Sequence, residues 1–179
     1  MALKQKAIFL DRDGTLIVEK QYLSDLKKLR FIKGSKKAIS IFKKNNFLCF
    51  VISNQSGINR GFLTELTLEK IHSEIKKRLL KEKTFLDGIY YCPHHPNENC
   101  LCRKPNTGLI KKICKKFNIS FKNSFIIGDK ASDIELGEKI GCKTILVLTG
   151  YGKKNMGKTK PNYIASNLLE AAQWIIKKK

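Results

Sequence analysis

Short apolar runs alternate with segments of helical periodicity along this chain of 179 residues. Strands joined through helices pair in parallel, and the helices then cover both faces of the sheet. The sequence therefore predicts an α/β fold with a doubly wound, mostly parallel sheet. Strands are expected at residues 7–10, 47–52, 86–91, 124–127 and 144–148. Helices are expected at 35–45, 64–83, 107–117, 134–140 and 167–176, and loops at 19–25 and 150–160.

Polar side chains follow most of the predicted strands. Asp11 and Asp13 come directly after the first strand, Ser53 after the second, and Asp129 after the fourth. The third strand runs into a segment of cysteines and histidines that leads to Lys104. Because the carboxyl ends of parallel strands meet at one edge of a sheet, we expect these side chains to converge there. Taken alone, Asp-Gly at 13–14 also fits a solvated turn, but the convergence favours a functional site.

These residue types suit phosphoryl transfer. A carboxylate can attack phosphorus, and a second acid can protonate the leaving oxygen. Carboxylates repel an approaching phosphate, so a hard cation such as Mg²⁺ is needed, and we assign it to Asp11, Asp13 and Asp129. Ser53 and Lys104 can take up negative charge that develops on phosphoryl oxygens. Asp133, one helical turn beyond Asp129, is expected to support the site rather than to bind metal.

A second cluster consists of Cys92 and His94, followed by Cys100 and Cys102. Three thiolates and one imidazole suit tetrahedral Zn²⁺. No coordination position is left for substrate or water, so the zinc is expected to be structural. The alternatives are free cytosolic thiols and, as the fourth ligand, His95 in place of His94.

Motifs across nearly the whole chain resemble the haloacid dehalogenase superfamily of phosphatases. With the zinc loop, they resemble in particular the family of D-glycero-D-manno-heptose 1,7-bisphosphate 7-phosphatases. The segments that carry this resemblance are Phe9-Leu10-Asp11-Arg12-Asp13-Gly14, Asn54-Gln55-Ser56-Gly57-Ile58 with Arg60-Gly61, Tyr90-Tyr91-Cys92-Pro93-His94-His95-Pro96, Cys102-Arg103-Lys104-Pro105 and Gly128-Asp129-Lys130.

The resemblance implies a Rossmann-like fold and a Mg²⁺-dependent hydrolase that removes the 7-phosphate through an aspartyl-phosphate intermediate. That reaction belongs to the carbohydrate metabolism that makes nucleotide-activated heptose for lipopolysaccharide. The resemblance makes Asp11 the nucleophile and Asp13 the acid/base, with Ser53 and Lys104 as further catalytic residues. The substrate contacts that it implies are Glu19, Lys20, Gln21, Tyr22, Ser53, Asn54, Gln55, Arg103, Lys104 and Lys130.

Three other functions compete with this interpretation. Histidinol-phosphate phosphatases are similar and share the zinc loop. A phosphatase of nucleic-acid 3′-phosphate ends would use the same chemistry, whereas a zinc-and-nucleic-acid module without activity has no use for the acids. Only 39 residues separate Asp13 from Ser53, and a loop, a helix and a strand occupy them. The sequence therefore predicts no cap domain, so that only loops cover the catalytic edge.

The net charge of +21 raises the question of nucleic-acid binding. It arises from 31 lysines scattered through every segment and only 5 arginines. Dedicated phosphate readers favour arginine, so no nucleic-acid partner is expected. The resemblance implies a small sugar bisphosphate as the partner. The N-terminus lacks a signal peptide and no apolar run is long enough to span a membrane, which predicts a cytoplasmic protein. We expect residues 1–179 to form one domain, with a zinc loop at 92–102, and the protein to be a monomer. His72 is expected at the surface or the edge of the core.

Overall fold

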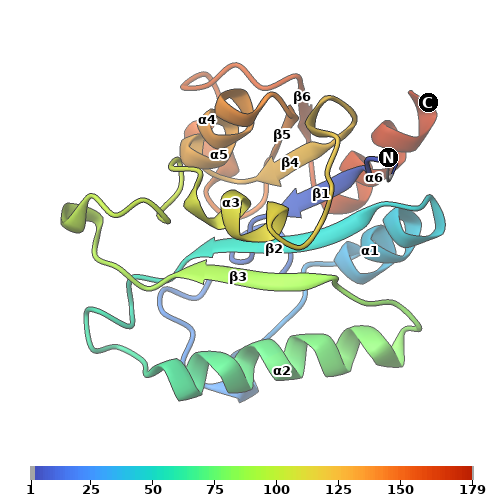
Figure 1. The fold of residues 1–179 in the computed structure, drawn as a ribbon. Helices are drawn as coiled ribbons and strands as arrows, with labels where there is room; N and C mark the ends of the chain where they lie inside the picture. The colour runs from blue at the N-terminus through green and yellow to red at the C-terminus, as the bar shows by residue number, and fades with distance from the viewer. Residues whose placement is uncertain (1–2, 179) are drawn as a thin grey trace.

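Six parallel strands form one sheet, in the order β3-β2-β1-β4-β5-β6 (Figure 1). The structure is a computed structural model that describes residues 3–178. The strands are β1 (Ala7–Leu10), β2 (Leu48–Asn54), β3 (Gly88–Cys92), β4 (Phe125–Gly128), β5 (Lys143–Val147) and β6 (Tyr163–Ala165). Every pair of neighbours is parallel, as predicted, and β1 lies between β2 and β4. The arrowheads of the strands in Figure 1 therefore point to one common edge.

The helices lie on both faces of this sheet, which confirms the doubly wound α/β fold. They are α1 (Ser35–Lys44), α2 (Glu65–Lys81), α3 (Gly108–Cys114), α4 (Ala131–Ile140), α5 (Gly152–Asn155) and α6 (Leu168–Lys177). Short 3-10 turns occur at Leu26–Lys28, Pro96–Glu98 and Phe121–Asn123. The oxygen of the Thr64 side chain accepts a hydrogen bond from the backbone N–H of Thr67, so Thr64 caps α2 as expected.

Alternation along β1 divides the core into two parts. Ile8 and Leu10 pack on one face together with side chains of α1, α2 and α6. Ala7 and Phe9 pack on the other face with side chains of α3 and α4. Successive side chains of a strand point to opposite faces, and both faces are covered here, so the whole of β1 is buried and apolar.

Besides the short 3-10 turns, one helix and one strand were not predicted. The segment 150–160, expected to be a loop, contains the four-residue helix α5, so that expectation is wrong in part. Strand β6 adds a sixth strand at the edge of the sheet. Four and three residues are too few to show a helical or alternating pattern, and the packing of their neighbours decides their conformation.

The segments between the catalytic motifs are filled by core elements. One 3-10 turn, α1 and β2 occupy the chain between Asp13 and Ser53, and α2 and β3 follow before Lys104. Within residues 3–178 no separate cap domain is formed, as the spacing predicts. No helix in that range is both long enough and apolar enough to cross a membrane.

Candidate active site and zinc loop

A cleft of about 380 Å³ opens at the carboxyl edge of the sheet. It brings together most residues that the sequence singled out. The predicted residues that line it are Asp11, Asp13, Glu19, Gln21, Tyr22, Ser53, Asn54, Gln55, Arg103, Lys104 and Lys130. Lys20 lies in an adjoining hollow formed by residues 20–25 and Lys28 rather than in the cleft. Four lining residues had not been predicted as site residues, namely Arg12, Ser56, Ser132 and Tyr151.

Lys104 is the centre of a buried ionic network. Its ammonium group lies 2.6 Å from Asp11 Oδ1, 2.6 Å from Asp133 Oδ1 and 2.7 Å from the carbonyl oxygen of Ile52. Only 4% of Lys104 is exposed. Burial opposes its charge, but Asp11 and Asp133 raise its pKa above the ordinary value. Burial also opposes ionisation of Asp11, yet Lys104 and Lys130 lower the pKa of its carboxyl, so Asp11 is an anion at neutral pH.

Three buried carboxylates, those of Asp11, Asp129 and Asp133, lie within 4.8 Å of one another. Asp129 Oδ2 accepts a hydrogen bond of 2.7 Å from the backbone N–H of Tyr151. Asp129 Oδ1 is buried and has no hydrogen-bond partner among the described residues. Burial and the charge of Asp11 raise the pKa of Asp129 to about 8. A divalent cation suits this group, because it would satisfy the orphaned oxygen and offset the repulsion between the carboxylates.

Asp133 is held in place from two sides. Its Oδ2 accepts a hydrogen bond of 3.1 Å from the backbone N–H of Lys130, at the start of α4, while its Oδ1 is bound by Lys104. Both oxygens are therefore engaged by the protein. Asp133 orients Lys104, in agreement with the supporting position expected from the sequence.

The carboxylate of Asp13 lies apart from the three acids and is held by Arg12 and Gln55. Arg12 donates to both of its oxygens, at 2.9 and 3.1 Å, and Gln55 Nε2 donates to Oδ2 at 2.8 Å. The geometry therefore does not support the expectation that this carboxylate binds Mg²⁺ beside Asp11 and Asp129. Gln55 Nε2 also donates to Ser53 Oγ at 2.6 Å, which links the ends of β1 and β2.

His72 is buried behind Arg12, which corrects the expectation of a surface or core-edge side chain. Arg12 Nη1 donates to His72 Nε2 at 3.2 Å. Burial, together with the charges of Arg12 and Lys76, lowers the pKa of His72 to about 3. The imidazole is therefore neutral at physiological pH and can accept a hydrogen bond from an arginine, which has no lone pair to offer.

A loop of residues 19–25 forms one side of the cleft. Glu19 Oε2 lies 3.6 Å from the ammonium group of Lys130. Gln21 and Tyr22 both have positive φ angles, of 34° and 53°, which residues other than glycine rarely adopt. The ring of Tyr22 stacks on that of Phe62, with centroids 4.4 Å apart and an interplanar angle of 17°. The stack holds the loop against the segment that follows β2.

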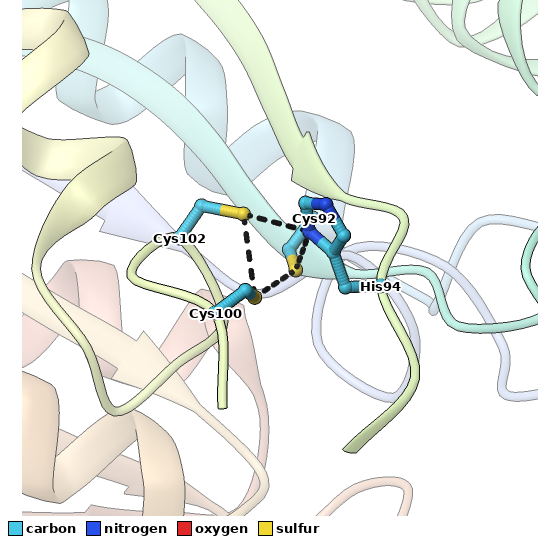
Figure 2. Close-up of side chains that lie close together, drawn as sticks. All are labelled: Cys92, His94, Cys100 and Cys102. Carbon is cyan, nitrogen blue, oxygen red and sulfur yellow. Dashed lines mark hydrogen bonds between the residues drawn. The ribbon is translucent and has the colours of Figure 1, made fainter. Parts of the chain in front are cut away.

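The four predicted zinc ligands point toward a common centre at the end of β3 (Figure 2). Their sulfur and Nδ1 atoms are separated by 3.2 to 3.6 Å along four edges, Cys92–His94, Cys92–Cys100, His94–Cys102 and Cys100–Cys102. Bonds of about 2.3 Å to sulfur and 2.0 Å to nitrogen give edges of about 3.5 to 3.8 Å in a tetrahedron. His95 instead caps the 3-10 turn at Pro96–Glu98, where its Nδ1 accepts from Asn97 N–H. The donor set and its spacing therefore fit tetrahedral zinc.

The zinc loop is joined to the cleft through Arg103 and Lys104, which follow Cys102 directly. Arg103 Nη1 donates to the carbonyl oxygen of His94 at 3.4 Å. The Asn54 side chain holds the backbone of Lys104 by two hydrogen bonds, accepting from its N–H at 2.9 Å and donating to its carbonyl at 3.1 Å. Lys104 is thus anchored both to the zinc loop and to β2.

The site defines a phosphatase of the haloacid dehalogenase class. At one edge of a parallel sheet it combines an acid pair after β1, a hydroxyl after β2, a buried lysine and an acid after β4. The sequence model of the family described as HAD-hydrolase-like matches residues 101–171. The D-glycero-beta-D-manno-heptose-1,7-bisphosphate 7-phosphatase of Helicobacter pylori is 41% identical over 177 residues, covering 98% of this chain and 99% of the relative. The D-glycero-alpha-D-manno-heptose-1,7-bisphosphate 7-phosphatase of Campylobacter jejuni is 36% identical, covering 82% of this chain and 84% of the relative.

A solved structure supports the same relationship. The D,D-heptose 1,7-bisphosphate phosphatase of B. bronchiseptica, complexed with magnesium and phosphate, has a TM-score of 0.91 and 27% identity. The alignment covers 97% of this chain and 99% of that one. The chain belongs to the family of D-glycero-D-manno-heptose-1,7-bisphosphate 7-phosphatases.

Proposed function

We propose that this phosphatase removes the 7-phosphate of D-glycero-D-manno-heptose 1,7-bisphosphate with the help of Mg²⁺, in the biosynthesis of nucleotide-activated heptose. The observation that carries the proposal is the buried contact of Asp11 with Lys104, beside the orphaned oxygen of Asp129, at the floor of an open cleft. This arrangement supplies an ionised nucleophile, a cation for the phosphoryl group and a site for a metal ion. Relatives named for this reaction span almost the whole chain.

The reaction proceeds in two displacements. A carboxylate oxygen of Asp11 attacks phosphorus, and the bond between phosphorus and the sugar oxygen breaks. Asp13 gives its proton to that leaving oxygen, and the phosphoryl group remains on Asp11 as an acyl phosphate. Asp13 then takes a proton from a water molecule, whose oxygen attacks phosphorus. Inorganic phosphate leaves and the carboxylate of Asp11 is restored.

Several side chains assist these two displacements without exchanging atoms with the substrate. Lys104 and the hydroxyl of Ser53 stabilise negative charge on the phosphoryl oxygens. Asp11 and Asp129 would hold Mg²⁺, which when bound offsets the repulsion between the carboxylates and the phosphate. Arg12 and Gln55 orient Asp13 toward the cleft. The predicted sugar and phosphate contacts are Glu19, Gln21, Tyr22, Asn54, Arg103 and Lys130, with Lys20 at the rim.

In this proposal the zinc ion is structural and takes no part in the reaction. Four protein ligands, Cys92, His94, Cys100 and Cys102, leave no position for substrate or water. Fixing Cys102 also fixes the start of Arg103 and Lys104. We further infer a single domain that acts as a cytoplasmic monomer, as expected from the sequence.

A phosphate-release assay tests the proposal. The substrates are both anomers of the heptose bisphosphate, histidinol phosphate and a 3′-phosphorylated oligonucleotide. We expect the highest kcat/KM for one heptose bisphosphate anomer, with release of one phosphate per molecule. Relatives named for each anomer match this chain, so the assay includes both. A higher kcat/KM for histidinol phosphate or for the oligonucleotide would overturn the proposed substrate.

A further inference from the structure

Tyr151 lines the catalytic cleft, although neither the sequence pattern nor the resemblance assigns it a role. It follows β5 and immediately precedes α5, the short helix that was not predicted. The ammonium group of Lys130 lies 4.9 Å from the centroid of the Tyr151 ring, which is within the range of a cation–π interaction. Lys130 is one of the expected substrate contacts. The ring of Tyr151 therefore touches a residue of the proposed binding machinery.

The backbone of Tyr151 is fixed by hydrogen bonds on both sides of it. Its own N–H donates to Asp129 Oδ2 at 2.7 Å. Two positions earlier, Thr149 Oγ1 donates to the carbonyl oxygen of Gly14 at 2.5 Å, which ties this segment to the turn after β1. Four positions later, Asn155 Nδ2 donates to the carbonyl oxygens of Asp129 at 3.2 Å and Tyr151 at 3.0 Å. These bonds hold α5 against the turn between β4 and α4 (Figure 1), so the Tyr151 side chain starts from a fixed point.

Lys130 is more exposed and less tightly paired than Lys104. Its side chain is 41% exposed, whereas that of Lys104 is 2% exposed. The ion pair of Lys130 with Glu19 spans 3.6 Å, whereas that of Lys104 with Asp11 spans 2.6 Å. A long side chain that becomes ordered only when a ligand binds loses rotamer freedom at that moment, and this loss weakens binding. A ring that restricts Lys130 beforehand reduces the loss.

We propose that Tyr151 is a positioning residue, whose ring holds the ammonium group of Lys130 in the orientation that binds the phosphorylated substrate. This inference rests on the proposed function, in which Lys130 contacts the substrate. The face of an aromatic ring carries partial negative charge and attracts a cation without neutralising it. A carboxylate in the same place would form a close ion pair that an incoming phosphate must displace. The ring orients Lys130 and leaves its charge available to the phosphate.

Steady-state kinetics of variants at position 151 test this role. Tyr151→Leu removes the ring but keeps the backbone N–H that binds Asp129. We expect its KM to rise about three- to tenfold, with kcat within about twofold of wild type. Tyr151→Phe keeps the ring and should restore most of the affinity. Lys154→Ala is the control, because the Lys154 ammonium group lies 5.9 Å from the centroid of the same ring but Lys154 is exposed and does not line the cleft. It should behave like wild type.

A double-mutant cycle then shows whether the ring acts through Lys130. Lys130→Ala should raise KM at least as much as Tyr151→Leu does. If the ring works only by orienting Lys130, the double variant Lys130→Ala/Tyr151→Leu should have the KM of Lys130→Ala alone. The substrate for all variants is the one that wild type cleaves with the highest kcat/KM in the phosphate-release assay. A wrong assignment of the substrate would therefore overturn the proposed function while the cycle still decides the role of Tyr151.

The other outcomes contradict the positioning role. Additive effects of the two substitutions would show that the ring contacts the substrate itself. An unchanged KM in Tyr151→Leu would show that Lys130 needs no support from the ring. Equal losses in Tyr151→Leu and Tyr151→Phe would assign the effect to the hydroxyl group. A fall in kcat at constant KM, together with a lower melting temperature, would make Tyr151 part of the structure around Asp129 instead.

Discussion

Asp11 is the residue on which the proposed chemistry depends most directly. Asp11→Asn is nearly isosteric, but it removes the attacking anion and one charged partner of Lys104. We expect kcat to fall at least about 10³-fold. The melting temperature should stay near that of wild type, because Asp133 continues to pair with the buried lysine. Steady-state phosphate release and thermal melting on one preparation provide the measurement. Substantial activity in the folded variant would exclude Asp11 as the nucleophile.

His72 contacts Arg12 and does not line the cleft, so we expect it to be a positioning residue. We expect His72→Leu to lower kcat by about tenfold with little change in KM, because Arg12 loses its acceptor and then holds Asp13 less firmly. His72→Gln keeps an acceptor and should restore most of the activity. If both variants lose kcat equally, packing around His72 matters rather than its hydrogen bond.

The lowered pKa of His72 also predicts a dependence of stability on pH. The folded state holds a neutral imidazole down to a pH of about 3, whereas the unfolded chain binds a proton below its ordinary pKa of about 6.5. The contribution of His72 to stability is therefore complete above pH 6.5 and is lost as the pH falls. Its slope is at most about 1.4 kcal/mol per pH unit. Denaturant unfolding of wild type and His72→Gln between pH 7 and 5 should differ by this slope; parallel curves would contradict it.

At the scale of elements, the loop of residues 19–25 is held by the stack of Tyr22 on Phe62. A left-handed conformation costs a residue with a side chain about 1–2 kcal/mol, and an aromatic pair contributes about 0.5–1.5 kcal/mol. The two magnitudes are similar, so the stack is able to decide whether the loop keeps its conformation. Phe62 is 56% exposed, and the stack is therefore not a requirement of the core.

Removal of the Phe62 ring should loosen the loop of residues 19–25. We expect Phe62→Ala to raise KM several-fold with a smaller effect on kcat, because Gln21 and Tyr22 line the cleft while the reacting carboxylates do not move. Phe62→Tyr keeps the ring and should behave like wild type. Leu66→Ala, at another exposed apolar position, serves as the control. A fall in kcat at constant KM would contradict a role in gripping the substrate.

The zinc loop at 92–102 is the second element from which we expect an effect on catalysis from outside the cleft. Cys102→Ser should remove zinc and lower kcat, because a displacement of about 1 Å at Lys104 can cost about 10²-fold in rate. The clamp of Asn54 on the Lys104 backbone limits this loss. Cys114→Ser changes an exposed cysteine outside the loop and is the control. Zinc content, melting and kcat are measured together; a folded, zinc-free variant with normal kcat would remove the coupling.

At the scale of the whole molecule, the net charge of +21 predicts a positive long-range field around the protein. Such a field attracts an anionic sugar bisphosphate, and salt screens it over about 10 Å at 0.1 M. We expect kcat/KM to fall several-fold between low and physiological ionic strength, with kcat unchanged. A kcat/KM that does not depend on ionic strength would show that the lysines do not steer the substrate.

The sheet and its functional edge can be predicted from the sequence because the patterns that indicate them are local. Apolar runs of strand length, helical periodicity and polar residues after the strands are enough to predict the parallel sheet and its functional edge. The residues Asp11, Ser53, Lys104 and Asp129 were found in this way. So was the group of Cys92, His94, Cys100 and Cys102, because the four residues fall within eleven positions and their side chains suit one metal ion.

Contacts between distant segments were decided only by the tertiary structure. Arg12 meets His72 across 60 positions of sequence, and Lys104 meets Asp11 across 93. No local pattern shows that Asp13 is held by Arg12 and Gln55 rather than grouped with Asp129. Strand β6 is too short to have a period. Periodicity reports which side of an element is buried, whereas only packing determines which side chains meet there.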